Sequence, residues 1–152
     1  MALVAPLSKY KKRTYLIWIA VCLIFSVWFA YDGYFNSKFI DKHTVKGEAD
    51  DTLVFNQKVP YFLVIVAAML GGYFLIIRNR KITADENALI IDGKVNILYD
   101  SIQKIDKTHF DSKGHFTLTY KGPDGKETDR KISDRNYDNL GPILDHLVAK
   151  IS

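Results

Sequence analysis

The amino-acid sequence predicts a membrane α-helical hairpin, made of two transmembrane helices, followed by a small α+β domain. Two stretches, residues 15–31 and 59–77, contain no charged residue, although 25% of the 152 residues are charged. From residue 82 the apolar residues alternate with polar ones, which is typical of β-strands, and near the C-terminus they return at helical spacing. So short a soluble chain could not bury such long uncharged runs, so both are expected to cross a membrane.

The net charge of +4 is concentrated beside the uncharged stretches. Residues 1–14 form a basic N-terminal segment, and a second basic cluster follows residue 77. Together the two clusters make a basic collar of seven residues: Lys9, Lys11, Lys12, Arg13, Arg78, Arg80 and Lys81. The rest of the chain carries 14 basic against 17 acidic residues, so no contiguous basic surface is expected on the domain. Because nucleic-acid binding needs such a surface, no nucleic-acid partner is expected.

The first transmembrane helix is predicted at residues 15–31 and the second at 59–77. At 1.5 Å per residue they measure roughly 26 and 28 Å, against a hydrocarbon core of about 30 Å. Pro60 lies near the predicted start of the second helix, where a helix tolerates proline. The bulky end of the first stretch offers no small-x-small cleavage site, so a retained anchor is expected rather than a cleaved signal peptide.

Basic residues precede the first stretch and follow the second. Because Lys and Arg in short flanking segments stay in the cytoplasm, both termini are expected there. Residues 32–58 are then an extracytoplasmic loop, which is predicted to be irregular, and a bacterial inner membrane is the expected location. The acidic residues of this loop and His43 lack the spacing of a metal site.

Small residues recur at four-residue spacing in the second predicted helix. Ala67 with Gly71, and Ala68 with Gly72, lie on adjoining faces, where another helix could approach closely. These four are the expected helix-packing residues. Their partner is the first helix of the same chain, a second copy or another subunit, and packing within the hairpin is favoured.

Residues 78–152 are expected to form a cytoplasmic domain of five or six antiparallel strands and a C-terminal helix. Asp92-Gly93 between two apolar runs predicts a β-hairpin. Alternation in residues 116–120 predicts a half-buried strand.

An apolar stripe from Tyr137 to Ile151 predicts that the last element is an amphipathic helix. Ser133 and Asp134 are candidate helix-start residues. Gly141-Pro142 lies within the pattern, so the helix either kinks there or begins there.

Three segments of this domain resemble the bacterial pleckstrin-homology-like membrane proteins. They are residues 82–93, residues 97–105 with their I-x-x-I ending, and the closing helix, and the two spans add to the likeness. The resemblance implies an antiparallel pleckstrin-like sheet capped by a C-terminal helix, in a membrane-associated scaffold without catalytic residues. The 71 residues from Ile82 onward are short for a seven-stranded barrel, so a strand is either missing or supplied by a partner.

No enzyme motif is recognised in the sequence. Cys22 lies in the middle of a span, the four histidines are scattered, and neither span contains a charge or a histidine that could serve an ion path or hold haem. A non-enzyme without cofactor or metal is therefore expected, acting as an accessory or scaffolding subunit of a larger membrane protein complex. Its partners would be the lipid bilayer and other membrane subunits or further copies of itself. The alternative is a membrane-surface module, anchored by the hairpin, that binds lipid or protein.

Overall fold

The computed structural model describes residues 2–152, which form two compact units. One is a helical hairpin that covers Arg13–Ile76. The other is an α+β unit in which the N-terminal residues up to Lys12 fold together with Ile77–Ser152. The α+β unit is therefore assembled from two segments that the whole hairpin separates in the sequence.

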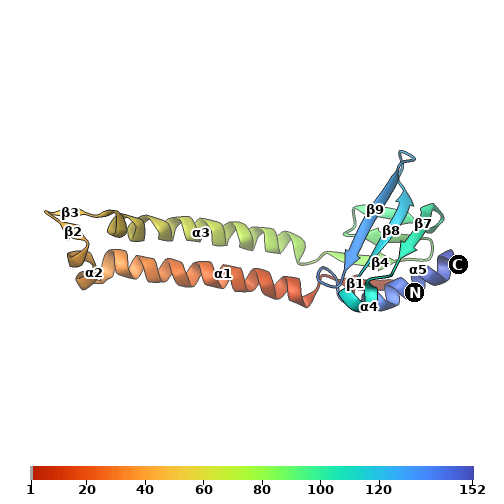
Figure 1. Ribbon diagram of the computed structural model, residues 1–152, viewed down its shortest axis with the longest axis horizontal. Helices are drawn as coiled ribbons and strands as arrows, with labels where there is room; N and C mark the ends of the chain where they lie inside the picture. The colour runs from red at the N-terminus through yellow and green to blue at the C-terminus, as the bar shows by residue number, and fades with distance from the viewer. Residues whose placement is uncertain (1) are drawn as a thin grey trace. The chain divides into compact units, whose positions relative to one another are not determined.

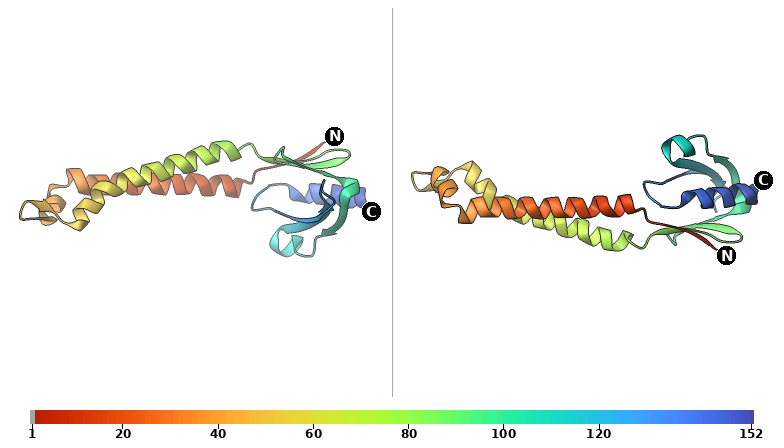
Figure 2. Two further views of the ribbon diagram at one scale, coloured as in Figure 1. Left: turned by 90° about the horizontal axis from the view of Figure 1, so that it is seen from above. Right: turned by 90° about the horizontal axis from the view of Figure 1, so that it is seen from below.

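Two long antiparallel helices make up most of the hairpin unit, and they lie side by side in every view (Figure 1; Figure 2). Helix α1 spans Lys9–Ala30 and continues as the π-helix η1, Tyr31–Phe35, whereas α3 spans Asp51–Ile77. Each helical stretch of 27 residues is long and apolar enough to cross a membrane. Only 6% and 17% of their most apolar windows are buried, so they differ from the core helices of a soluble protein.

The connection between the long helices is more ordered than the predicted irregular loop. It contains helix α2, Ser37–Lys42, strand β2, Thr44–Val45, and strand β3, Glu48–Ala49. Strands β2 and β3 pair antiparallel around Lys46 and Gly47, which both have positive φ, as a type I′ turn requires. Helix α3 begins at Asp51, eight residues before the charge-free run, so it is about two turns longer at this end than that run alone predicted.

A hydrogen bond and aromatic ring contacts connect α1 and α3. The Ser26 hydroxyl is buried and donates a hydrogen bond to the Pro60 carbonyl oxygen over 3.0 Å. Pro60 thus lies inside α3 rather than in its first turn, where the sequence placed it. Towards the other end of the hairpin, the Tyr15 ring packs on Tyr73, with centroids 5.7 Å apart.

The α+β unit contains two antiparallel sheets and a C-terminal helix (Figure 1). The first sheet has the order β1-β4-β5-β6, with strands Leu3–Pro6, Lys81–Ala84, Ala88–Ile91 and Val95–Leu98. The second has the order β7-β8-β9, with strands Ile102–Asp106, His115–Lys121 and Glu127–Ser133. A 3₁₀ turn, η2 (Tyr99–Ser101), joins the sheets, the short helix α4 (Phe110–Lys113) joins β7 to β8, and α5 spans Leu140–Ile151. The predicted small α+β class is confirmed.

Strand β1 was not expected, since residues 1–14 were interpreted only as a basic segment. It pairs with β4 along its length, from Leu3 opposite Ala84 to Pro6 opposite Lys81. Four apolar residues that end in proline carry too little periodicity to predict a strand. The chain itself therefore adds a strand to those that follow the second helix.

Two local predictions for the α+β unit are resolved by the structure. The Asp92-Gly93 hairpin is confirmed, because both residues have positive φ and the Lys94 N–H donates to the Ile91 carbonyl oxygen over 3.0 Å. Helix α5 begins near Gly141-Pro142 rather than kinking there, and Ser133 and Asp134 lie before it in a turn. Proline in the first helical turn costs no intrahelical hydrogen bond.

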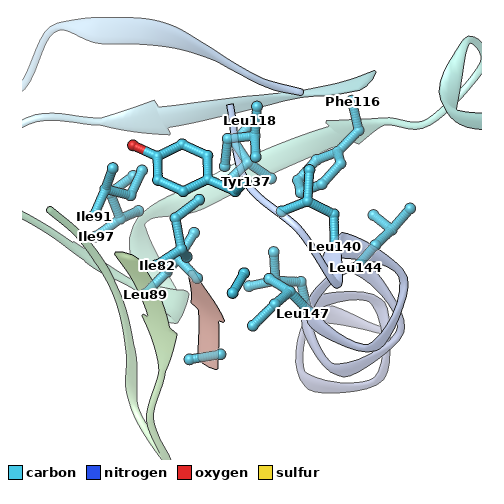
Figure 3. Close-up of a cluster of buried hydrophobic side chains, with 14 of the residues drawn as sticks. Ile82, Leu89, Ile91, Ile97, Phe116, Leu118, Tyr137, Leu140, Leu144 and Leu147 are labelled. Carbon is cyan, nitrogen blue, oxygen red and sulfur yellow. The ribbon is translucent and has the colours of Figure 1, made fainter. Parts of the chain in front are cut away.

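The core of the α+β unit lies between the two sheets and α5. Figure 3 shows Ile82, Leu89 and Ile91 of the first sheet directed towards Phe116 and Leu118 of the second. From α5, the same cluster receives Leu140, Leu144 and Leu147. All eight side chains are at most 5% exposed, so the helical stripe that the sequence predicted supplies the third wall of the core.

Candidate functional site: the basic collar

Strand pairing brings the two halves of the basic collar together. The backbone of Leu7, just before the N-terminal cluster, donates its N–H to the carbonyl oxygen of Arg80 over 2.9 Å. Pro6 lies opposite Lys81 in the same strand pair. The chain therefore passes from β1 into α1 and returns from α3 into β4 through neighbouring antiparallel strands, which sequence spacing alone did not show.

The start of α1 is held by the segment between β9 and α5. Ser8 is fully buried, its N–H donates to the Asn136 carbonyl oxygen over 2.9 Å, and its hydroxyl donates to the Arg135 carbonyl oxygen over 2.5 Å. The same hydroxyl accepts the N–H of Lys11 at 3.1 Å, which is the position of an N-cap. The sequence analysis missed this residue, although serine directly before a helix is a signal that could have found it.

A carboxylate from the same segment also contacts the first turn of α1. Asp138 accepts the backbone N–H of Lys9 at 3.0 Å, and its own N–H donates to the Pro6 carbonyl oxygen over 2.9 Å. A negative charge at a helix N-terminus is favourable because it meets the positive end of the helix dipole. The first residues of α1, up to Lys12, are thus hydrogen-bonded within the α+β unit to which they belong.

Two of the seven collar cations are engaged by polar side chains. Lys11 Nζ donates to Asn136 Oδ1 over 3.0 Å, and an Arg80 Nη lies 3.9 Å from an Asp92 oxygen. Lys9, Lys12, Arg13, Arg78 and Lys81 form no ion pair within the described residues. Those five charges are therefore not paired with a carboxylate of residues 2–152.

Asp92 anchors Arg80 because a second group holds it in place. The Tyr137 hydroxyl donates to the other Asp92 oxygen over 2.8 Å. Burial of the Tyr137 ring, together with this hydrogen bond to a carboxylate, raises the pKa of the phenol well above its usual value. Tyr137 therefore remains a neutral donor at physiological pH and links the β5–β6 turn to the segment before α5.

The four predicted helix-packing residues lie in different environments on α3. Ala67 is buried and Gly71 is half-buried, whereas Ala68 and Gly72 are exposed. A Cβ built on either glycine would meet nothing within 4 Å, so neither is a point of close approach in this chain. Close approach occurs instead at Gly33, where a Cβ would lie 2.9 Å from the Asn56 backbone.

Two further contacts away from the collar involve histidine side chains. His43 Nδ1 lies 2.8 Å from Asp50, which also accepts the Leu53 N–H at 2.8 Å and so caps α3. His109 and His115 come together across α4, with ring centroids 5.6 Å apart. Within residues 2–152, no group of three or more His, Cys, Asp or Glu side chains could hold a metal ion.

Known proteins were compared with this chain at the level of family models, curated sequences and solved structures. None of the three comparisons found a match. The function is therefore inferred from the collar, the hairpin and the paired sheets alone.

Proposed function

We propose that the chain is a two-pass membrane protein, with α1 and α3 across the bilayer and both termini in the cytoplasm. Large apolar side chains cover the outside of the hairpin, among them Trp18 and Trp28, which are 58% and 60% exposed. A bilayer would bury this surface. The collar cations lie at the N-terminal end of α1 and beyond the C-terminal end of α3, which supports cytoplasmic termini by the positive-inside rule.

The α+β unit is proposed to be a pleckstrin-homology-like domain that is interrupted by the membrane hairpin. Four antiparallel strands, then three, then a C-terminal helix follow the strand plan of that fold. Strand β1 would be its first strand and β4 its second, so the 71 residues after the hairpin need supply only six. This arrangement would explain why the C-terminal segment seemed too short for a seven-stranded barrel.

The proposed role is that of an accessory or scaffolding subunit in a larger membrane protein complex. The observation that carries it is that β1 and β4 pair directly, while β1 leads into one long helix and β4 follows the other. Both chain connections to the hairpin therefore start from neighbouring strands of one sheet, which supports a subunit whose α+β unit is joined to its membrane segment twice. The open Ala68 and Gly72 positions leave one face of α3 free for a neighbouring helix.

Site-specific photocrosslinking in native membranes tests this role. A photoreactive amino acid at Gly72 is expected to give a protein adduct. The same probe at Tyr73, which is 44% exposed and projects about 100° away around the helix, should react mainly with lipid. If both positions give lipid adducts only, the subunit proposal is wrong.

The alternative is a module that binds the membrane surface through the collar. It is favoured by the five collar cations without an ion pair, each worth about 1 kcal/mol near an anionic leaflet. Hydrogen exchange of the full chain in nanodiscs distinguishes the two roles. The surface module requires extra protection at residues 78–81 when anionic lipid replaces neutral lipid, whereas a scaffold does not.

A further inference from the structure

Strand β9 forms one edge of the second sheet of the α+β unit. Within residues 2–152 this sheet has the order β7-β8-β9 (Figure 1). Strand β9 pairs with β8 along its whole length, from Ser133 opposite His115 to Glu127 opposite Lys121. Its first five residues, 127–131, are all exposed. An exposed edge of this length is a template for pairing with a further strand.

Hydrogen bonds at both ends of the β8–β9 pair identify the backbone groups that face outwards. At one end the Gly122 N–H donates to the Lys126 carbonyl oxygen over 2.9 Å. At the other end the Asp134 N–H donates to the Gly114 carbonyl oxygen, also over 2.9 Å. Hydrogen-bonded and non-hydrogen-bonded residue pairs alternate along an antiparallel pair. The even-numbered residues of β9 therefore bond to β8, and the N–H and C=O groups of the odd-numbered residues, 127 to 133, point away from it.

The odd-numbered residues of β9 carry both signs of charge. Glu127 and Asp129 are acidic, Lys131 is basic, and none of the three forms an ion pair within the described residues. One oxygen of Asp129 accepts the Thr119 hydroxyl over 2.6 Å, which leaves the other oxygen for a further partner. Charged side chains on an edge strand oppose pairing with an unrelated strand. A strand that pairs here must therefore place opposite charges against them.

A second copy of β9 meets this requirement. When two copies pair antiparallel around Arg130, Asp129 of each copy lies opposite Lys131 of the other, and Glu127 lies opposite Ser133. Oppositely charged residues that face each other across a strand pair stabilise it. All four outward-facing residues then take part, and the four residue pairs exchange about eight backbone hydrogen bonds.

Registers centred on Asp129 or Lys131 are less favourable. Each forms one hydrogen-bonded residue pair fewer, and each places two like charges opposite each other at its centre. The register around Arg130 opposes two arginines, but these side chains are on the other face of the sheet, which they share with Ile132. They are long and exposed, so the two guanidinium groups can diverge into solvent.

We propose that two copies of the chain associate through antiparallel pairing of their β9 strands, centred on Arg130. The two three-stranded sheets then form one continuous six-stranded sheet. The occupant of the edge is a second copy because the charges of β9 are complementary to themselves under a two-fold axis, as a symmetric dimer interface requires. The proposal depends neither on membrane insertion of the hairpin nor on the helix-packing face of α3.

Cysteine cross-linking of the full chain in isolated native membranes tests the register. At the centre of the strand pair the two Arg130 Cα atoms would be about 4.5 Å apart, a distance that a disulfide can span. Arg130→Cys, in a chain whose native Cys22 is replaced by alanine, should therefore form a disulfide-linked dimer on mild oxidation. Thr128→Cys, on the same face, is the matched control, because the two Thr128 Cα atoms would be about 14 Å apart.

Charge reversal tests the pairing while Arg130 is kept. Asp129→Lys places two lysines opposite each other at two positions, so the dimer should dissociate about tenfold or more readily in sedimentation velocity of the detergent-solubilised chain. The double variant Asp129→Lys/Lys131→Asp brings opposite charges together again and should restore the dimer. Glu86→Lys makes the same charge change in the exposed β4–β5 turn and should have no effect.

Loss of the hydrogen bond from Thr119 cannot imitate these results. Both variants at Asp129 lose that bond, whereas only the single variant should lose the dimer. Hydrogen exchange of the β8 amides in both variants verifies that the fold is intact.

Any of four results would overturn the proposal. The first two are a monomer at every concentration and equal cross-linking at positions 128 and 130. The third is a dimer that Asp129→Lys leaves unchanged, since that dimer would form through another surface. The fourth is a cross-link from position 130 to a different protein, because the edge would then serve an unrelated partner. None of these results bears on the subunit role, which the probe at Gly72 tests separately.

Discussion

The two units of this chain distribute polar and apolar side chains in opposite ways. In the α+β unit the buried cluster is apolar, as with Leu89 and Phe116, and charged residues cover the outside. In the hairpin unit the outside is apolar, and the few buried residues include the polar Ser26 and Asn56 beside the apolar Leu53 and Ala67. Water around one unit and lipid around the other would produce this inversion, because apolar surface is costly only in water.

Different interactions also stabilise the two units. Burial of large side chains from three walls stabilises the α+β unit. In the hairpin, helix contact includes the close approach at Gly33, the hydrogen bond from Ser26 to Pro60 and aromatic ring contacts such as that of Tyr15 with Tyr73. Substitutions of the same kind should therefore have different consequences in the two units, and four experiments test this difference, from the largest expected effect to the smallest.

Phe116→Ala should have the largest effect. The side chain is fully buried in the α+β core, and its removal leaves a cavity that costs about 3 to 5 kcal/mol of the free energy of unfolding. Hydrogen exchange of the β8 amides in the detergent-solubilised chain measures the loss. Val27→Ala on the outside of α1, where the side chain is 70% exposed, is the control and should leave β8 unchanged. If both variants changed the exchange of the β8 amides equally, the proposed difference between the two units would be contradicted.

Gly33→Ala should destabilise the hairpin by about 1 to 3 kcal/mol, because the added methyl group overlaps the Asn56 backbone at 2.9 Å. Thermal unfolding in detergent, followed by the helical circular dichroism signal, measures this change. Gly72→Ala adds the same methyl group where nothing lies within 4 Å and should be neutral or slightly stabilising. An unchanged melting temperature for Gly33→Ala would show that the helices do not approach there.

Ser8→Ala should cost about 1 kcal/mol or somewhat more, because it removes the N-cap of α1. It also removes the hydroxyl that donates a hydrogen bond to the Arg135 carbonyl oxygen. Faster amide exchange at Lys11, which donates to the lost hydroxyl, is the measurement. Ser37→Ala, an exposed serine at the start of α2, serves as the control. If exchange at Lys11 does not change, the hydrogen bond is not formed in solution.

Acid should produce the smallest effect, confined to the hairpin connection. Hydrogen bonds from the Leu53 backbone and then from His43 lower the pKa of Asp50 below its usual value near 3.8. A carboxyl pKa that is lower in the folded than in the unfolded state stabilises the fold at any pH above the unfolded-state pKa. That stabilisation is lost as the pH falls through the folded-state pKa. The Leu53 amide chemical shift should therefore titrate below about pH 4. Asp50→Asn should abolish the transition, and a persistent transition would exclude Asp50 as its cause.

Much of the architecture could be predicted because it depends on local patterns. The length of the two charge-free stretches predicted both long helices, and Asp92-Gly93 predicted the β5–β6 hairpin. The apolar stripe up to Ile151 predicted α5. Each signal lies within one segment and follows from the environment that segment must enter. The candidate site was predicted only in part, since the collar residues were found but not their arrangement.

Contacts between distant segments account for what could not be predicted. Strand β1 exists because Leu3–Pro6 finds β4 as a partner after the entire hairpin has intervened. Ser8 is buried because residues 135–138 cover it, and Gly33 matters because the Asn56 backbone lies beside it. None of these partners is close in the sequence, so no periodicity points to them.

The sequence by itself determined the composition of this protein's parts: two apolar helices, a collar of cations, and an alternating segment that ends in an amphipathic helix. These follow from hydrophobicity and charge, which each residue carries wherever it lies. Only the tertiary structure decided that the N-terminal residues belong to the α+β unit and that the two halves of the collar meet beside one strand pair. Hydrogen bonding between strands depends on which backbones come together, and the fold alone supplies that information.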